Sequence, residues 1–308
     1  MRVVITEFMD EAAVVSLAAR FDVSYDATLV DRPADLRTLL STADAVVVRN
    51  RTQVNGEFLA AAPRVKVVGR LGVGLDNIDF PGCKARGIEV IPASGANALA
   101  VAEYVIGTAM MLLRGAYAST TEVGDGKWPR TALSDGREIA GKTLGVIGFG
   151  GIGRLTANLA RALGMRVVGF DAQIPATASD WHEANTAPLA LDELLRSADV
   201  VTLHVPLTAQ TKGLLGAAKL ARMKPDAILI NTARGGVVDE AALASALRSG
   251  KLGGAALDVF EHEPLAAGSP LARCPNLILT PHVGGVTRES NVRVSTLIAD
   301  KVAAALTR

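Results

Sequence analysis

The stretch from Leu144 to Asp171 constrains the fold more than any other part of this 308-residue chain. It reads LGVIGFGGIGRLTANLARALGMRVVGFD, a short apolar run followed by a glycine-rich turn and then by apolar residues at helical spacing. A second apolar run ends at Asp171. Strand, glycine turn, helix and strand in this order are typical of a parallel βαβ unit. The stretch therefore predicts an α/β fold in which helices cover a parallel sheet.

The glycines of this turn are Gly148, Gly150 and Gly153, in G-x-G-x-x-G spacing. Such glycines permit a tight turn, a close approach of the backbone to a pyrophosphate, and close packing of helix on strand. Asp171 follows roughly 20 residues later, where a carboxylate accepts a hydrogen bond from a ribose 2′-hydroxyl. Because a carboxylate repels a 2′-phosphate and no basic residue follows directly, the pattern predicts NAD rather than NADP. A glycine-rich turn of another α/β domain, or an S-adenosylmethionine-dependent methyltransferase, is the alternative.

Composition excludes several classes of function. Apolar residues make up 49% of the chain and charged residues 20%, which suits two packed domains. A net charge of +1 and 4% aromatic residues argue against a nucleic-acid or membrane-surface binder. The most apolar long segment, residues 98–113, is short for a membrane span. With Cys83 and Cys274 as the only cysteines and no signal peptide, we expect a cytoplasmic protein without disulfides or a metal site.

Three polar motifs follow predicted strands, INTARGG, LDVFEHEP and LTPHVGG. They contain Arg234, Glu263 and His282, and ligands of parallel sheets bind beyond the carboxyl ends of the strands. Oxidation of an alcohol needs a group that accepts the hydroxyl proton, which suits a histidine oriented by a carboxylate. An arginine suits a carboxylate substrate. The alternatives are structural roles: Arg234 could bind carbonyls of its loop, and Glu263 could belong only to a turn.

The other three histidines have weaker claims. His182 lies in a polar segment typical of a surface, and His204 follows a strand and precedes Pro206, where it would cap a carbonyl. His262 adjoins Glu263 and is expected to be solvated.

At these motifs the chain resembles the D-isomer-specific 2-hydroxyacid dehydrogenases, which include D-3-phosphoglycerate dehydrogenase, glyoxylate reductase and D-lactate dehydrogenase. The resemblance extends over nearly the whole chain, with GRLGVGLDNID, ANALAVAEYV, HVPLT and NTARGGVVDE in the expected order. It implies an NAD-dependent oxidoreductase that transfers hydride between NAD and a small 2-hydroxy or 2-oxo acid. It also implies two doubly wound parallel-sheet domains separated by a cleft. A Rossmann NAD domain at residues 98–283 would be inserted into a flavodoxin-like substrate domain formed by residues 1–97 and 284–308.

The resemblance also implies roles for individual residues. Arg234 would bind the substrate carboxylate and carbonyl, His282 would act as general acid and base, and Glu263 would pair with His282 and raise its pKa. The substrate carboxylate would also bind to backbone N–H groups of Leu71, Gly72 and Val73. Cofactor contacts, including the turn glycines above, are expected at Gly148, Gly150, Gly151, Ile152, Gly153, Asp171, Val205, Thr232, Arg234, Asp258, His282 and Gly284.

The identity of the substrate is read from a weaker pattern. VVRNRT carries Arg49, at a position that is basic in phosphoglycerate dehydrogenases, and Arg51, where a small residue is usual. Both arginines are predicted substrate contacts for a second anionic group, as in 3-phosphoglycerate. Together with ITEFMDE, this segment also resembles the (S)-sulfolactate dehydrogenases. The alternative is that these arginines form salt bridges within the domain.

Other functions within the same fold remain open. A glyoxylate or hydroxypyruvate reductase would need no second anion site. An NAD-binding corepressor-like scaffold would carry a longer tail, and a formate dehydrogenase would have an amide in place of Glu263. The arm at residues 114–142 resembles the dimer contact of the family, so a homodimer is expected. No regulatory domain is expected after residue 308.

Overall fold

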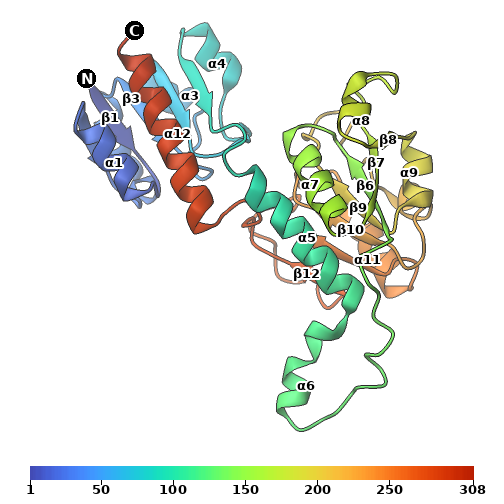
Figure 1. Cartoon of the computed structure of the whole chain (residues 1–308). Coiled ribbons are helices and arrows are strands. Elements are labelled where there is room, and N and C mark those ends of the chain that lie inside the picture. Colours follow the sequence, from blue (N-terminus) through green and yellow to red (C-terminus); the bar gives the residue numbers. More distant parts are fainter. The chain divides into compact units, whose positions relative to one another are not determined.

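The computed structural model describes residues 1–308 and divides into two compact units (Figure 1). The smaller unit comprises residues 1–97 and 286–308, and the larger comprises residues 98–285. The sequence placed the second boundary at 283/284. The larger unit instead ends two residues later, at Gly285. The backbone N–H groups of Val283 and Gly284 donate to the carboxylate of Asp258 at 2.8 Å each, which ties this segment to the larger unit.

The smaller unit is a five-stranded parallel sheet in the order β2-β1-β3-β4-β5, the flavodoxin-like order. Its strands are β1 (Arg2–Ile5), β2 (Asp22–Tyr25), β3 (Ala45–Val48), β4 (Val67–Arg70) and β5 (Glu89–Pro92). Its helices are α1 (Glu11–Ala18), the 3-10 helix η1 (Leu29–Asp31), α2 (Pro33–Leu40), α3 (Gly56–Ala61), α4 (Phe80–Ala85) and α12 (Arg288–Leu306).

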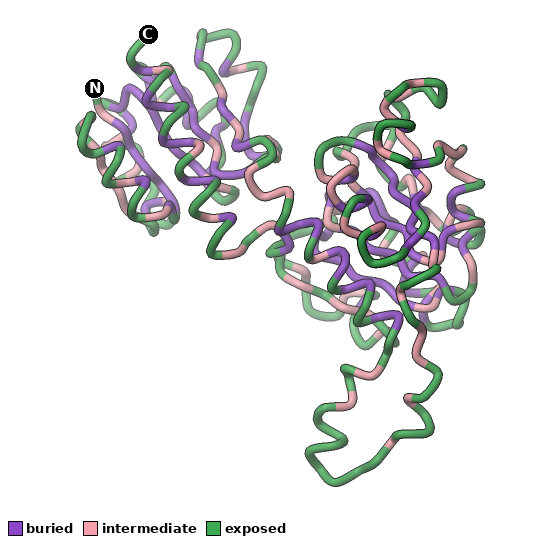
Figure 2. The backbone as a smooth tube through the Cα atoms, viewed as in Figure 1, coloured by how far each residue is buried: buried purple, intermediate pink, exposed green.

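The strands β1, β3 and β4 are almost entirely buried (Figure 2). Their alternating side chains build two apolar layers. Val3 and Ile5 of β1 pack with residues of α1 and α12, whereas Val4 packs with residues of α2, α3 and α4. This is the period of two that a strand imposes when both faces of its sheet are covered.

The larger unit is a seven-stranded parallel sheet in the order β12-β11-β10-β9-β6-β7-β8, the Rossmann order extended by one strand. Its strands are β6 (Thr143–Ile147), β7 (Arg166–Phe170), β8 (Ala187–Pro188), β9 (Val200–Leu203), β10 (Ile228–Asn231), β11 (Gly254–Leu257) and β12 (Leu277–Leu279). Its helices are α5 (Ala98–Arg114), η2 (Ala116–Ser119), α6 (Thr120–Gly124), α7 (Gly151–Ala162), α8 (Ser179–Glu183), α9 (Leu191–Ser197), α10 (Ala217–Leu220) and α11 (Glu240–Arg248). The two sheets confirm the predicted fold class.

The two faces of this sheet are covered by different helices. Val146 of β6 packs in one cluster with residues of α5 and α7, while Ile147 packs in the other with residues of α9, α10 and α11. No single helix is long and apolar enough to span a membrane, although α5 and the bent segment that follows it reach that length and composition together.

Two segments are less regular than the rest of the larger unit. The arm at residues 114–142 contains η2 and α6, and none of its residues is buried. The helix α10 is short and covers only Ala217–Leu220. Leu215 forms an isolated β-bridge with Val238 instead, which keeps the start of that segment extended.

The packing of α7 on β6 generates a stability prediction. A Cβ on Gly153 would lie 2.2 Å from the carbonyl oxygen of Gly148, whereas a Cβ on Gly151 would meet nothing within 4 Å. Gly153→Ala should therefore lower the free energy of unfolding by about 1–3 kcal/mol, the usual range for overpacking. Gly151→Ala is the matched control, and denaturant unfolding measures both. Equal stability of the two variants would contradict the close packing.

Candidate active site

Three polar loops leave the same edge of the larger sheet. Asn231 at the end of β10 is in register with Leu257 at the end of β11, and Leu257 is in register with Leu279 at the end of β12. Because the three parallel strands end at one level, the loops that carry Arg234, Glu263 and His282 begin side by side. This is the edge at which parallel α/β sheets bind ligands.

Glu263 and His282 form a direct pair. Oε2 of Glu263 lies 2.8 Å from Nδ1 of His282, and both side chains are partly exposed to solvent. Oε1 of Glu263 accepts a hydrogen bond from the backbone N–H of Phe260 at 3.1 Å, which orients the carboxylate. Since an ionised carboxylate can only accept, Nδ1 carries the proton, and in the neutral imidazole Nε2 is left as the acceptor.

The backbone of His282 has a conformation that few residues adopt. Its φ is +58°, in the left-handed region, and its N–H donates to the carbonyl of Thr280 at 3.0 Å. The buried carboxylate of Asp258 holds the surrounding loop, because it accepts from the Thr280 hydroxyl at 2.6 Å as well as from Val283 and Gly284. Asp258, which was predicted to contact the cofactor, thus forms hydrogen bonds with the loop that carries His282.

Arg234 lies in a loop that its neighbours shape. The side-chain amide of Asn231 donates to the carbonyl of Arg234 at 2.9 Å, and its oxygen accepts from the N–H of Ala233 at 3.0 Å. A Cβ on Gly235 would lie 1.8 Å from the carbonyl oxygen of Phe260. Gly235 therefore lets the arginine loop lie directly against the loop that leads to Glu263.

The glycine-rich turn has the room that a pyrophosphate needs. Gly148 has φ +92°, and a Cβ there would lie 2.4 Å from the carbonyl oxygen of His204. Gly150 and Gly151 face open space, since a Cβ on either would meet nothing within 4 Å. No side chain caps the N-terminus of α7, so its first N–H groups can bind an anion.

Two further observations fit a dinucleotide. The carboxylate of Asp171 accepts from the backbone N–H of Phe149 at 2.7 Å and of Gln173 at 2.8 Å, which orients it at the end of β7. The hydroxyl oxygen of Thr232 is buried and has no hydrogen-bond partner. Because buried polar atoms are seldom left unpaired, this hydroxyl is suited to a ligand group. The residues present therefore fit NAD.

The remaining predicted cofactor residues flank these groups. Ile152 and Val205 are both half-buried, at the start of α7 and after β9, and Gly284 is buried against the Asp258 carboxylate. His204, one of the other three histidines, lies near these residues in sequence. Its Nε2 is 3.1 Å from Oγ1 of Thr202, and burial lowers the pKa of its imidazole to about 4. It is therefore neutral at pH 7.

The predicted carboxylate loop lies in the smaller unit, after β4. Its backbone N–H groups are already used in part, because Leu71 donates to the carbonyl of Val48 and Gly72 donates to that of Arg70, both at 2.8 Å. Leu71 and Gly72 are buried, whereas Val73 is exposed. Val73 is thus the member of this loop whose N–H makes no hydrogen bond within the protein.

The two arginines predicted for a second anion differ in their surroundings. Arg51 forms an exposed ion pair with both carboxylate oxygens of Asp31, as in the salt-bridge alternative. The guanidinium of Arg49 is half-buried, donates to the side-chain oxygen of Asn291 at 2.8 Å and lies over the ring of Phe8. Its direct partners are neutral.

A buried glutamate that sequence reasoning missed shapes the loop of both arginines. Glu7 is 4% exposed and accepts from the backbone N–H groups of Arg49, Arg51 and Thr52 at 2.9, 3.1 and 3.0 Å. The only signal for it in the sequence is an acidic residue directly after an apolar strand, which is not specific.

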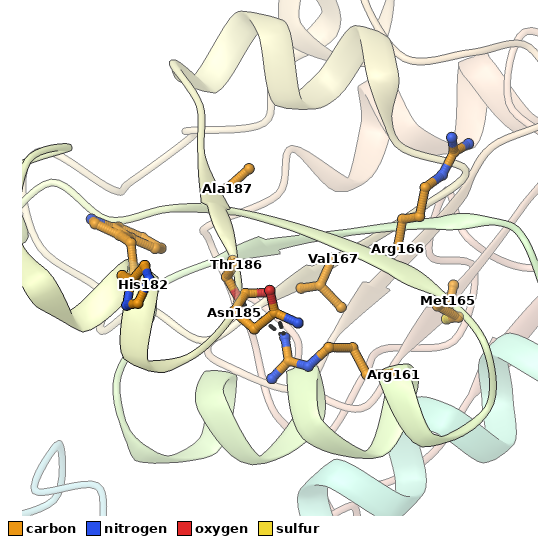
Figure 3. Close-up of a pocket in the computed structure, with 9 residues that line it drawn as sticks. Arg161, Met165, Arg166, Val167, His182, Asn185, Thr186 and Ala187 are labelled. Carbon is orange, nitrogen blue, oxygen red and sulfur yellow. Dashed lines mark hydrogen bonds between the residues drawn. The ribbon is translucent and has the colours of Figure 1, made fainter.

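A pocket at another edge of the larger unit contains none of the predicted site residues (Figure 3). It is lined by residues of α7, β7, β8 and the neighbouring α8, including Arg161, whose guanidinium donates to the carbonyl of Asn185 and the hydroxyl of Thr186. His182 lines this pocket, beside β8 at one end of the strand order. Glu263 and His282 follow β11 and β12, which lie at the other end of that order.

Comparison with known proteins agrees with these features. The family model for the NAD binding domain of D-isomer specific 2-hydroxyacid dehydrogenases matches residues 106–284. The chain is 52% identical over 304 residues to the (S)-sulfolactate dehydrogenase of Chromohalobacter salexigens, which covers 99% of this chain and 98% of that protein.

More distant relatives include longer proteins. The chain is 37% identical over 302 residues to the D-3-phosphoglycerate dehydrogenase of Methanocaldococcus jannaschii, covering 98% of this chain and 57% of that protein. It spans about half the length of the D-3-phosphoglycerate dehydrogenases that it matches. The crystal structure of D-lactate dehydrogenase from Aquifex aeolicus, complexed with NAD and lactic acid, has a TM-score of 0.86 at 29% identity, covering 100% of this chain and 96% of that one.

Proposed function

The chain belongs to the D-isomer specific 2-hydroxyacid dehydrogenase family, and from this premise we propose how its residues act on a 2-hydroxy acid. The protein is an NAD-binding oxidoreductase, and NAD when bound accepts or donates the hydride. The observation that carries the proposed site is the 2.8 Å pair of Glu263 and His282, at the sheet edge that also carries Arg234.

His282 takes the hydroxyl proton when the 2-hydroxy acid is oxidised and returns it when the 2-oxo acid is reduced. Its Nε2 is the free acceptor because Glu263 binds the proton on Nδ1. As Nε2 takes up a proton the imidazole becomes positively charged, and the adjacent carboxylate stabilises that charge. Glu263 therefore orients His282 and stabilises the charge that forms on the imidazole during the reaction.

Arg234 binds the substrate carboxylate and the developing carbonyl. A guanidinium offers paired N–H donors that match a carboxylate, and its charge does not depend on pH in the working range. In the smaller unit, the backbone N–H of Val73 is the substrate contact we propose, because it is the amide of residues 71–73 that makes no other hydrogen bond. The cofactor is held by the N-terminus of α7, Asp171 and Thr232.

The substrate carries a second anionic group, a sulfonate or a phosphate. Two observations support this: the high identity to a protein named (S)-sulfolactate dehydrogenase, and the guanidinium of Arg49, which hydrogen-bonds only to neutral groups although the charge of Glu7 acts on it. We assign the second anion to Arg49 rather than Arg51, because Asp31 already neutralises Arg51. A glyoxylate or hydroxypyruvate reductase would not need this charge.

The assembly we propose is a homodimer formed through residues 114–142. Trp128 is 78% exposed and Tyr117 is 59% exposed in the single chain, so this arm presents aromatic surface that a second copy would cover. Sedimentation equilibrium should give a dimer of the 31.9 kDa chain. A monomer that persists at micromolar concentration would contradict the dimer.

The location we propose is the cytoplasm, without nucleic-acid or membrane partners. Cys83 and Cys274 are both free thiols, which is compatible with a reducing compartment. Cell fractionation tests the location, and recovery of the protein with membranes would contradict it.

One kinetic prediction concerns the proton acceptor. His282→Ala should lower kcat by about 10²-fold or more, the usual contribution of a general base, with the affinity for NADH nearly unchanged. His182→Ala is the matched control, because this histidine is also exposed and lies in the same unit. Steady-state rates and a fluorescence titration with NADH measure the two effects. Full activity of His282→Ala would remove His282 from the mechanism.

Another kinetic prediction concerns the second anionic group of the substrate. Arg49→Ala should raise KM for sulfolactate or 3-phosphoglycerate by about 10- to 100-fold, the loss expected for a charge-assisted hydrogen bond, and leave KM for D-lactate nearly constant. Arg51→Ala should change neither KM substantially. The assay compares these substrates with glycerate. If Arg51→Ala affects the anionic substrates more than Arg49→Ala does, the assignment is wrong.

A further inference from the structure

A hydrogen-bonded chain connects α5 to the loop of His282. The hydroxyl of Tyr104 lies 2.6 Å from the hydroxyl of Thr280, which in turn lies 2.6 Å from Oδ1 of Asp258. Asp258 also accepts from the N–H groups of Val283 and Gly284. All of these hydrogen bonds lie within the larger unit. They hold Thr280, which precedes His282 in the sequence, and Val283 and Gly284, which follow it.

The direction of each bond follows from the donors available. The carboxylate of Asp258 can only accept, so the one hydroxyl proton of Thr280 points to Asp258. The oxygen of Thr280 must then accept from Tyr104, which makes Tyr104 the first donor. Burial raises the pKa of the Tyr104 phenol, so that the phenol keeps its proton at neutral pH.

The loop needs such support because of its backbone. His282 has φ +58°, which is unfavourable for a side-chain-bearing residue unless the surroundings fix it. The N–H of His282 donates to the carbonyl of Thr280, so the position of Thr280 sets that of the histidine backbone. Space is also limited, since a Cβ on Gly284 would lie 2.9 Å from Oδ2 of Asp258 and 3.4 Å from the ring of Tyr104.

We propose that Tyr104 is a positioning residue for His282, acting through Thr280 and Asp258. This inference rests on the proposed role of His282 as proton acceptor. Tyr104 hydrogen-bonds to neither His282 nor Glu263. By fixing Thr280 it keeps Nε2 of His282 in one orientation, and that orientation matters for proton transfer more than for cofactor binding. Small displacements at a reacting centre lower the rate substantially.

The test compares variants that remove single hydroxyl groups. Tyr104→Phe should lower kcat for sulfolactate by about 3- to 10-fold, the effect of one hydrogen bond, with KM for NAD and the unfolding temperature nearly unchanged. Thr280→Val should lower kcat further, and Thr280→Ser should restore most of it. Tyr25→Phe is the control, because its hydroxyl donates to the carbonyl of Met9 within the smaller unit and has no bond to the loop of His282.

A double variant shows whether Tyr104 acts through Thr280. The kcat of Tyr104→Phe combined with Thr280→Val should equal that of Thr280→Val alone, because the tyrosine then has nothing left to bond. Additive losses would overturn the proposal, as would wild-type kcat in Tyr104→Phe or a loss accompanied by an equal rise in KM for NAD. If both Tyr104→Phe and His282→Ala kept full activity, the proposed function would fail. If His282→Ala lost activity while Tyr104→Phe kept it, only the role of Tyr104 would be rejected.

Discussion

The parallel register of β10, β11 and β12 is the constraint on which the proposed site depends. Asn231, Leu257 and Leu279 lie at one level of the sheet, so three segments distant in sequence begin their loops at the same edge. The strands themselves are apolar and fixed by packing on both faces. Arg234, Glu263 and His282 therefore lie on the loops beyond the strands, and Glu263 and His282 pair there while they stay partly exposed to solvent, which avoids the cost of burying unpaired charge.

Buried carboxylates hold the loops of both units in the same way. Asp258 gathers the donors of residues 280–284, and Glu7 gathers the N–H groups of residues 49, 51 and 52. Each carboxylate is compensated by three hydrogen bonds rather than by an ion pair with an arginine, so the cationic side chains presented nearby are not consumed by it. The guanidinium of Arg49 therefore hydrogen-bonds to neutral groups, and His282 pairs with the separate carboxylate of Glu263.

Much of this arrangement could be predicted from the sequence, for identifiable reasons. The glycine pattern and Asp171 are local signals, and the order of strands and helices fixed the doubly wound class. Glu263 and His282 follow strands, so their proximity was expected from the parallel sheet. A salt bridge was one of the two interpretations of Arg51, but its partner Asp31 was not predictable, since Asp31 does not differ locally from any other exposed charge. Thr280 and Tyr104 are 176 residues apart, and only the packing of α5 on this sheet brings them together.

The central claim is that His282, oriented by Glu263, exchanges the proton of the substrate hydroxyl while NAD is bound at the N-terminus of α7. A crystal structure of the protein with NAD and a non-reactive 2-oxo acid analogue tests it most directly. The account predicts that the keto oxygen of the analogue lies about 3 Å from Nε2 of His282, within reach of proton transfer, with its carboxylate on Arg234. An analogue bound away from both side chains, or NAD bound away from Gly150 and Asp171, would contradict it.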